Sequence, residues 1–148
     1  MSDNIAMGFD EEMAIEEPAK APVIPLTRAK RLPYSTWEVG GSEYKLRLTA
    51  IDISKLEQRY RRNLLLYLTD DGIPAVADML TVIQAAMRTH HHGMTFLNVQ
   101  SLYDAFVDEG GDQNQLMTDV LMPLLSVSGF FTQNQAETLA QEIKDSNL

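Results

Sequence analysis

All three histidines of the chain are adjacent, in the stretch THHHGM at positions 89–94, and the chain contains no cysteine. Three imidazoles in a row suggest a metal site. However, consecutive residues of a helix point about 100° apart around its axis, so they cannot converge on one ion. Helical zinc ligands usually lie at i and i+4, as in H-E-x-x-H, and this run lacks that spacing. Gly93 is a suitable residue to end the preceding helix. We therefore predict a polar helix end at 90–92, and neither a metal site nor any other cofactor.

The sequence also lacks the other common arrangements of catalytic and phosphate-binding residues. It contains no G-x-S-x-G nucleophile motif and no G-x-x-x-x-G-K-[ST] phosphate loop. The stretch DEGGDQNQ resembles a calcium loop but fails its pattern. Counted from Asp108, position six is Gln113 rather than glycine, and position twelve is Asp119 rather than glutamate. We therefore predict that the chain is not an enzyme and that Asp112 caps the helix after this turn.

Composition and charge narrow the class of protein further. The 148 residues suit one domain with a tail, and the formal net charge of −9 argues against general binding to nucleic acids, whose phosphates attract clustered Lys and Arg. No apolar run approaches the roughly 18 residues needed to span a bilayer. The acidic start of the chain does not resemble a secretory signal, and the lack of cysteine favours an intracellular location. We expect a protein that acts in the cytoplasm, without nucleic acid or membrane as partner.

Residues 1–35 differ in composition from the rest of the chain. Six acidic residues come first, and four prolines with interspersed basic residues follow; the acids are Asp3, Asp10, Glu11, Glu12, Glu16 and Glu17. Such a segment has few large apolar groups to offset its chain entropy. We predict a flexible, acidic and Pro-containing arm over residues 1–35 and a single helical domain over residues 36–148.

The stretch TWEVGGSEYKLRLT at 36–49 has the pattern of a β-hairpin. Apolar and polar residues alternate on both sides of Gly40-Gly41, a pair that permits the positive φ angles of a tight turn. An isolated two-stranded hairpin is marginal in water, so it must pack on the rest of the domain. We expect it to close on the helices through its large apolar residues, Trp37, Val39, Tyr44, Leu46 and Leu48.

The remainder of the chain has the periodicity of helices. Ser54 and Glu57 fit a capping box at the start of a first helix. Between Val76 and Met87, six apolar residues recur at helical spacing, and polar residues form only a thin stripe. This pattern predicts a central helix. This pattern continues in the segments that follow, which makes the domain mainly helical.

Caps and breakers divide the second half of the chain. Thr95 can cap the next helix, and the paired glycines at 110–111 can end it. Pro123 lacks a donor and should kink or end the helix in which it lies. A last helix is expected after residue 132. The sequence therefore predicts a mainly α fold, a compact bundle of about five helices with one N-terminal β-hairpin.

The order of these features resembles that of a known family. TWEVGGSEYKLRLTAIDISKLEQRYRRNLL is similar to the start of the tail assembly chaperones of long-tailed, siphovirus-type phages that infect Gram-positive bacteria. Members of that family share a W-x-V-x-G-x-x-Y-x-L-R-L-like hairpin followed by a helix with a basic stretch. LYDAFVDEGGDQNQLMTDVL and the SGFF after it also resemble that family's later helix, acidic-glycine turn and next helix. The resemblance covers roughly residues 36–131.

The resemblance implies a function that no single residue shows. Such chaperones bind the long, aggregation-prone tape measure protein before the tail tube polymerises, and they are absent from the finished virion. It implies a non-enzymatic protein in the cytoplasm of the host bacterium. Its partners would be the tape measure protein and a frameshifted longer form of the chain itself, with the major tail protein and further copies of the chain as additional candidates.

Two groups of residues are candidates for partner binding. The basic cluster in RYRRN could meet an acidic partner or the acidic N-terminus of the chain, although a solvated helix face is the simpler interpretation. Exposed apolar positions near the C-terminus could dock on a helical client. The candidates are Arg59, Arg61 and Arg62 in the basic cluster, and Phe130, Phe131, Leu139 and Ile143 near the C-terminus.

Two other interpretations stay open at this point. A structural component of the virion, such as a head–tail connector or a tail-completion protein, would also be small and helical. A regulatory DNA-binding protein would need a helix-turn-helix within residues 75–109. The second of those helices, 95–109, carries acids and no Lys or Arg, whereas a recognition helix should meet phosphates with the opposite charge.

Overall fold

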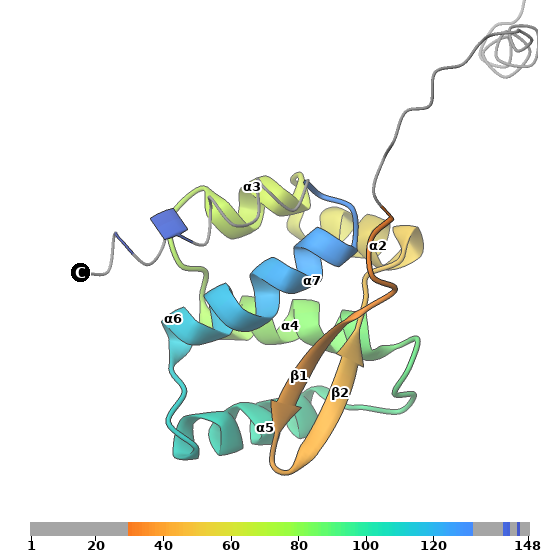
Figure 1. Cartoon of the computed structure of the whole chain (residues 1–148). Helices are drawn as coiled ribbons and strands as arrows, with labels where there is room; N and C mark the ends of the chain where they lie inside the picture. Colours follow the sequence, from red (N-terminus) through yellow and green to blue (C-terminus); the bar gives the residue numbers. More distant parts are fainter. Residues whose placement is uncertain (1–29, 132–140, 143–144, 146–148) are drawn as a thin grey trace, which may run out of the picture. The chain divides into compact units, whose positions relative to one another are not determined.

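Two strands and a series of helices make up the part of the chain that the computed structural model describes, residues 30–131, 141–142 and 145 (Figure 1). In chain order they are β1 (Ser35–Val39), β2 (Ser42–Leu46), α2 (Ala50–Tyr60), α3 (Leu64–Thr69), α4 (Val76–Met87), α5 (Phe96–Asp108), α6 (Gln113–Gln115), the π-helix η1 (Leu116–Leu121) and α7 (Met122–Val127). The predicted mainly α fold with one N-terminal hairpin is confirmed. Most of the predicted arm and of the predicted last helix lies outside the described residues.

The chain divides into two units, Met1–Lys30 and Arg31–Leu148, and every strand and helix named above belongs to the second unit. Within the described ranges, no helix is both long enough and apolar enough to cross a bilayer.

The hairpin forms as its sequence predicts. β1 and β2 pair antiparallel, with Trp37 opposite Tyr44, and the turn between them consists of Gly40 and Gly41 with φ angles of 62° and 79°. Two successive positive φ angles define a type I′ turn, which matches the twist of the strands it connects. Trp37 is only 2% exposed, and Val39, Leu46 and Leu48 are buried with it, while Tyr44 is partly buried. The predicted closure through these apolar residues is confirmed.

Hydrogen bonds fix the hairpin and the chain after it to three helices. The amide of Gly40 donates to Oε2 of Glu109 just beyond α5, at 2.9 Å. The amide of Arg47 donates to the carbonyl of Ala86 in α4, at 3.0 Å, and that of Leu48 donates to the hydroxyl of Ser128 after α7, also at 3.0 Å. The hairpin is therefore held along its length rather than only at its apolar face.

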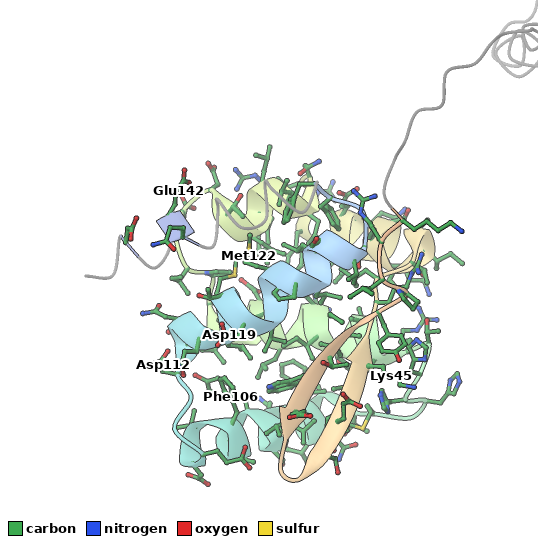
Figure 2. All side chains as sticks on the ribbon, viewed as in Figure 1. Lys45, Phe106, Asp112, Asp119, Met122 and Glu142 are labelled. Carbon is green, nitrogen blue, oxygen red and sulfur yellow. The ribbon has the colours of Figure 1, made fainter. Side chains whose placement is uncertain are left out.

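Helix α4 lies at the centre of the core, as its apolar sequence predicts. Six of its twelve residues are buried, more than in any other described helix; they are Met79, Leu80, Val82, Ile83, Ala86 and Met87. Phe106 of α5, labelled in Figure 2, packs against this core. Its ring centroid lies 5.8 Å from that of Trp37 in the hairpin, in an edge-to-face arrangement.

The start of α2 differs from the prediction. The helix begins at Ala50, and its N-cap is Thr49, whose hydroxyl accepts a hydrogen bond from the Asp52 amide while the Asp52 carboxylate accepts one from the Thr49 amide. The predicted capping box at Ser54 and Glu57 is therefore wrong. Asp52 is buried and also accepts a hydrogen bond from Arg88 at the end of α4. The cap at Thr49 therefore gains a tertiary contact that a cap at Ser54 would lack. Glu57 instead accepts a hydrogen bond from the Leu64 amide at the start of α3.

The histidine run also differs from the prediction. Helix α4 ends at Met87, five residues before His92, and the chain turns at once: the amides of His90 and His91 both donate to the Met87 carbonyl, at 3.2 and 2.7 Å. Gly93 has the expected positive φ, 83°, but it lies in the loop after this turn rather than at the helix end. The early turn brings His91 to the backbone of β2, a tertiary contact that helical periodicity does not encode.

The remaining caps and breakers behave largely as predicted. Thr95 caps α5 in a capping box with Asn98, and Asp112 caps α6 by accepting from the Gln115 amide. The helix that contains Pro123 does not end there. It widens into the π-helical stretch η1, which ends two residues before the proline, and it continues as α7 to Val127. In a π-helix each amide bonds five residues back, and the Met122 amide does so to the Met117 carbonyl.

Candidate functional site

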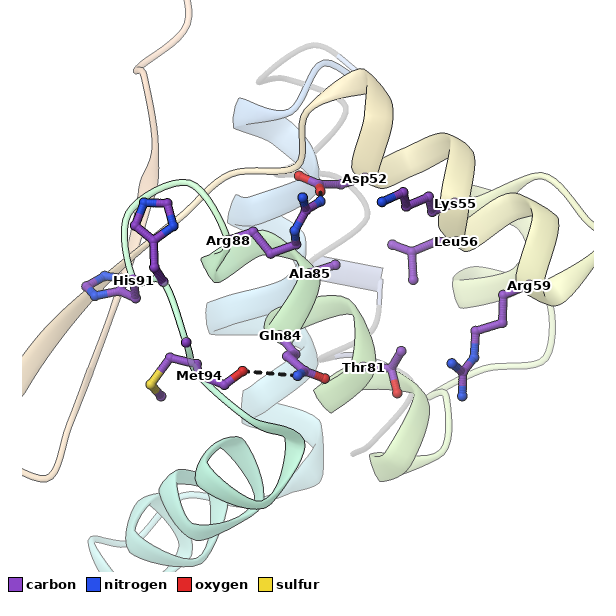
Figure 3. Close-up of a pocket in the computed structure, with 12 residues that line it drawn as sticks. Asp52, Lys55, Leu56, Arg59, Thr81, Gln84, Ala85, Arg88, His91 and Met94 are labelled. Carbon is purple, nitrogen blue, oxygen red and sulfur yellow. Dashed lines mark hydrogen bonds and ion pairs between the residues drawn. The ribbon is translucent and has the colours of Figure 1, made fainter.

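A groove of about 570 Å³ lies between α2 and α4, bordered by the turn that follows α4 (Figure 3). Helix α2 contributes Asp52, Lys55, Leu56 and Arg59, and helix α4 contributes Thr81, Gln84 and Ala85. Arg88, the C-cap of α4, and residues 91–94 of the turn complete the lining. The two helices run in opposite directions along it, because the start of α2 meets the end of α4 through Asp52 and Arg88. Arg59 and Thr81 lie together at the other end in Figure 3.

Both walls of the groove have the same helical spacing. The lining positions of each helix fall at offsets 0, 3, 4 and 7, which is one face of an α-helix over two turns, or about 10 Å. Residues at such offsets are those through which a helix normally packs against a neighbour. The groove is therefore lined by one face of each helix, and no described element of the chain fills it.

The groove combines an apolar floor with a basic rim. Leu56 is buried, and Ala85 and Met94 are partly buried, so they form the apolar surface. Lys55, Arg59 and Arg88 are exposed along the edges. The local charge is positive although the whole chain has a formal net charge of −9.

Asp52 is the one acidic residue of the groove, and the fold already satisfies its charge. Its side chain is only 2% exposed, and Oδ2 accepts hydrogen bonds from the amide and the hydroxyl of Thr49 at 3.0 and 2.9 Å. Oδ1 accepts a charge-assisted bond from Nη1 of Arg88, whose side chain is 55% exposed. This ion pair joins the two walls at one end, and it leaves the exposed cations as the charges available to a partner.

The turn after α4 is fixed by two side-chain bonds. Nε2 of Gln84 donates to the carbonyl of Met94 at 3.1 Å, as the dashed line in Figure 3 shows. Nε2 of His91 accepts from the Lys45 amide at 2.8 Å, and its ring lies against Tyr44 with centroids 5.2 Å apart. Burial lowers the pKa of His91, and the nearby charges of His90 and Lys45 lower it further. The neutral imidazole is the form that can accept this bond.

Among the residues that the structure describes, the histidines have no further metal ligands beside them. Within the described ranges, no group of three or more His, Cys, Asp or Glu side chains could hold a metal ion. His91 faces the hairpin backbone, and the ring of His90 lies against Tyr34, with centroids 5.4 Å apart.

The sequence model of one family matches residues 31–147, which include both walls of the groove. The chain belongs to the family of unknown function DUF6096. No curated protein and no solved structure matched the chain.

The structure separates the predicted basic cluster. Arg59 lines the groove, but Arg61 and Arg62 do not. Arg61 ends α2 in the left-handed conformation, with φ 57° and ψ 41°, and Arg62 forms an ion pair with Asp70 after α3. The cluster RYRRN thus supplies one groove residue, one helix cap and one connection between α2 and α3.

Two of the predicted apolar contact residues, Phe130 and Phe131, lie within the described part of the chain, and neither is exposed. Phe131 is 7% exposed and belongs to the core, and Phe130 is partly buried against it. The amide of Phe130 donates to the Leu125 carbonyl at 3.1 Å, in the hydrogen-bond pattern that closes a helix around Gly129. The assumption that Phe130 and Phe131 are exposed is therefore wrong. Leu139 and Ile143 lie outside the described residues.

Sequence reasoning missed most of the groove. Lys55 and Arg88 were not selected because neither is adjacent to another Lys or Arg in the sequence. The sequence does contain a repeated spacing of 0, 3, 4 and 7 at positions 52–59 and 81–88, which indicates one helix face in each segment. A single sequence does not show that these two faces lie beside each other in the fold.

Proposed function

We propose that this protein is a tail assembly chaperone, which binds the tape measure protein of a long-tailed phage and keeps it soluble before the tail tube polymerises. The observation that carries the proposal is the groove between α2 and α4, which is lined by one face of each helix. It gives the sequence resemblance a physical counterpart, because a chaperone of this class needs a surface that receives a long helical client.

The composition of the groove supports binding more than chemistry. Its polar side chains are cations at the rim and one carboxylate that is already paired, while its floor is apolar. Reversible binding of a helix needs such a mixture of apolar contact and exposed charge. The net charge of −9 also favours solubility of the chain when it carries an aggregation-prone client.

In this proposal the chain acts in the cytoplasm of the host bacterium, without catalysis and without a cofactor. It binds the tape measure protein, together with a frameshifted longer form of itself, and leaves before the virion is complete. The major tail protein and further copies of the chain are additional candidate partners.

Co-expression tests the proposal. The tape measure protein encoded in the same operon is produced with and without this chain, and its soluble fraction is measured after centrifugation. We expect the client to become soluble and to co-purify with the chain. If the client stays equally insoluble in both cultures, the chaperone proposal is wrong.

The head–tail connector interpretation predicts a different location for the protein. Mass spectrometry of purified virions distinguishes the two, because a chaperone leaves during assembly whereas a connector stays. We expect no peptides from this chain beyond trace amounts. Abundant peptides, at a level similar to those of tail structural proteins, would contradict the chaperone proposal.

A further inference from the structure

We infer that the groove between α2 and α4 binds an acidic amphipathic helix, and that segments of this type are the ones the protein recognises in its client. That the client is the tape measure protein rests on the proposed function above. The chemistry of the bound segment rests only on the groove itself, on its shape, its charge and its floor.

The shape of the groove requires a helix. Its two walls are antiparallel helices, each presenting positions at offsets 0, 3, 4 and 7, and both extend over the same two turns. A helix laid between them would contact both faces at once, as in an ordinary bundle of three helices. An extended peptide would need unpaired backbone groups from a strand edge, and neither wall supplies them, because α-helical amides and carbonyls already bond within the helix.

The charge of the rim requires acidic residues on the flanks of that helix. Lys55 and Arg59 are exposed on the α2 side, three and seven residues after Asp52, and no described residue forms an ion pair with either. Arg88 stands on the α4 side with its Asp52 bond already made and more than half of its side chain exposed. Glutamates on both flanks of a bound helix would therefore meet cations from both walls.

The floor requires small or medium apolar residues between those flanks. Leu56 and Ala85 lie opposite each other at the middle of the two walls, and Met94 adds a flexible apolar side chain from the turn. Methionine adapts to different partners at little cost, which suits a surface that accepts several similar segments of one long client. The bound helix would thus be apolar on one face and acidic beside it.

Two synthetic peptides test this assignment with the full-length protein. Both are fluorescein-labelled 18-residue helices with leucine at helical spacing, and their flanking positions are all glutamate in one and all lysine in the other. We expect fluorescence anisotropy to give a Kd at least about tenfold lower for the glutamate peptide. This preference should weaken as salt is raised. Equal Kd values for the two peptides, or binding of neither, would overturn the inference.

Charge reversal in the groove provides the decisive variant. The double variant Lys55→Glu with Arg59→Glu should lose about tenfold or more in affinity for the glutamate peptide and gain affinity for the lysine peptide. Arg61→Glu is the matched control for the single variant Arg59→Glu, because it makes the same change of charge two residues away but outside the groove. A loss as large in Arg61→Glu as in Arg59→Glu would assign the effect to overall charge and overturn the inference.

Folding and function are separated by two further measurements. Circular dichroism and thermal unfolding check that each variant is folded. If the charge-reversal variant unfolds, the neutral double variant Lys55→Gln with Arg59→Gln replaces it. This neutral variant should bind the glutamate and lysine peptides with equal affinity. In the co-expression assay, a groove variant that solubilises the tape measure protein as well as wild type does would overturn the groove assignment while leaving the chaperone proposal intact. If the wild-type chain prefers the glutamate peptide but fails to solubilise the client, the chaperone proposal is wrong and the groove assignment stands.

Discussion

His91 holds the hairpin through the backbone of Lys45: its Nε2 accepts a hydrogen bond from the Lys45 amide, and the two nitrogens are 2.8 Å apart. The bond joins the turn after α4 to the edge of β2. A protonated imidazole has no acceptor nitrogen, so the contact exists only in the neutral form. Burial, followed by the charges of His90 and Lys45, lowers the pKa of His91 in the folded protein.

Stability should therefore fall as the solution is acidified. An unfolded histidine has a pKa of about 6.5, so below that pH the unfolded chain binds more protons at this position than the folded chain does. The contribution of His91 is present in full above the unfolded pKa and is lost as pH falls through the folded pKa. We expect a lower urea midpoint at pH 5.5 than at pH 7.5. His91→Gln, which keeps an acceptor that does not titrate, should reduce this difference, whereas His92→Gln should retain it.

Gly111→Ala should destabilise the protein through one contact. A Cβ atom at Gly111 would lie 2.5 Å from the Phe106 ring, and that ring packs edge-to-face against Trp37. Overpacking of this kind costs about 1–3 kcal/mol of unfolding free energy, measurable by urea denaturation followed through Trp37 fluorescence. In a Phe106→Leu background the same substitution should cost clearly less. An equal cost in both backgrounds would show that the ring is not the cause.

Arg61→Gly should stabilise the protein. Arg61 is the one residue other than glycine in the described ranges with a positive φ, and it occupies the position at the end of α2 where glycine is preferred. Removing the Cβ penalty should raise the unfolding free energy by about 0.5–1 kcal/mol, seen as a higher Tm. Arg62→Gly is the control: it loses the ion pair with Asp70 without relieving a positive φ, so its Tm should not rise. A lower Tm for Arg61→Gly would mean that its side chain makes a compensating contact.

Asp52→Asn should cost more stability than Asp70→Asn. The carboxylate of Asp52 is 2% exposed and accepts bonds from Thr49 and Arg88, and an amide places a donor where an acceptor is required. We expect a loss of about 1–3 kcal/mol in the free energy of unfolding. Asp70 pairs with Arg62 at the surface, and exposed pairs contribute at most about 1 kcal/mol. Urea denaturation of the two variants gives the comparison, and equal losses would contradict the structural role of Asp52.

The hairpin and the central helix could be predicted from the sequence because local patterns determine them. Gly40-Gly41 permits the positive φ angles of a two-residue hairpin turn, and alternation on both sides then fixes which face is buried. The apolar sequence of α4 likewise leaves no face suited to water except a thin stripe. In these elements, local preference and tertiary packing require the same conformation.

The misplaced elements are those in which tertiary contacts decided between local alternatives. Thr49 and Ser54 can both cap a helix, and the Asp52–Arg88 pair across 36 residues favours the first. The turn at His90 and His91 forms early because the hairpin offers His91 a hydrogen-bond donor. The groove was missed for the same reason, since it exists only when α2 and α4 lie side by side.

The π-helical stretch Leu116–Leu121 affects how this chain is aligned with its relatives. A π-helical turn accommodates more residues than an α-helical turn, and each added residue rotates everything after it by about 100°. A family member with a plain α-helix at this place would be one residue shorter between Gln113 and Val127. An ungapped alignment would then pair every residue after this stretch with a position one residue away from its structural equivalent. An alignment of this chain with such a member should therefore place a single-residue gap within 116–121.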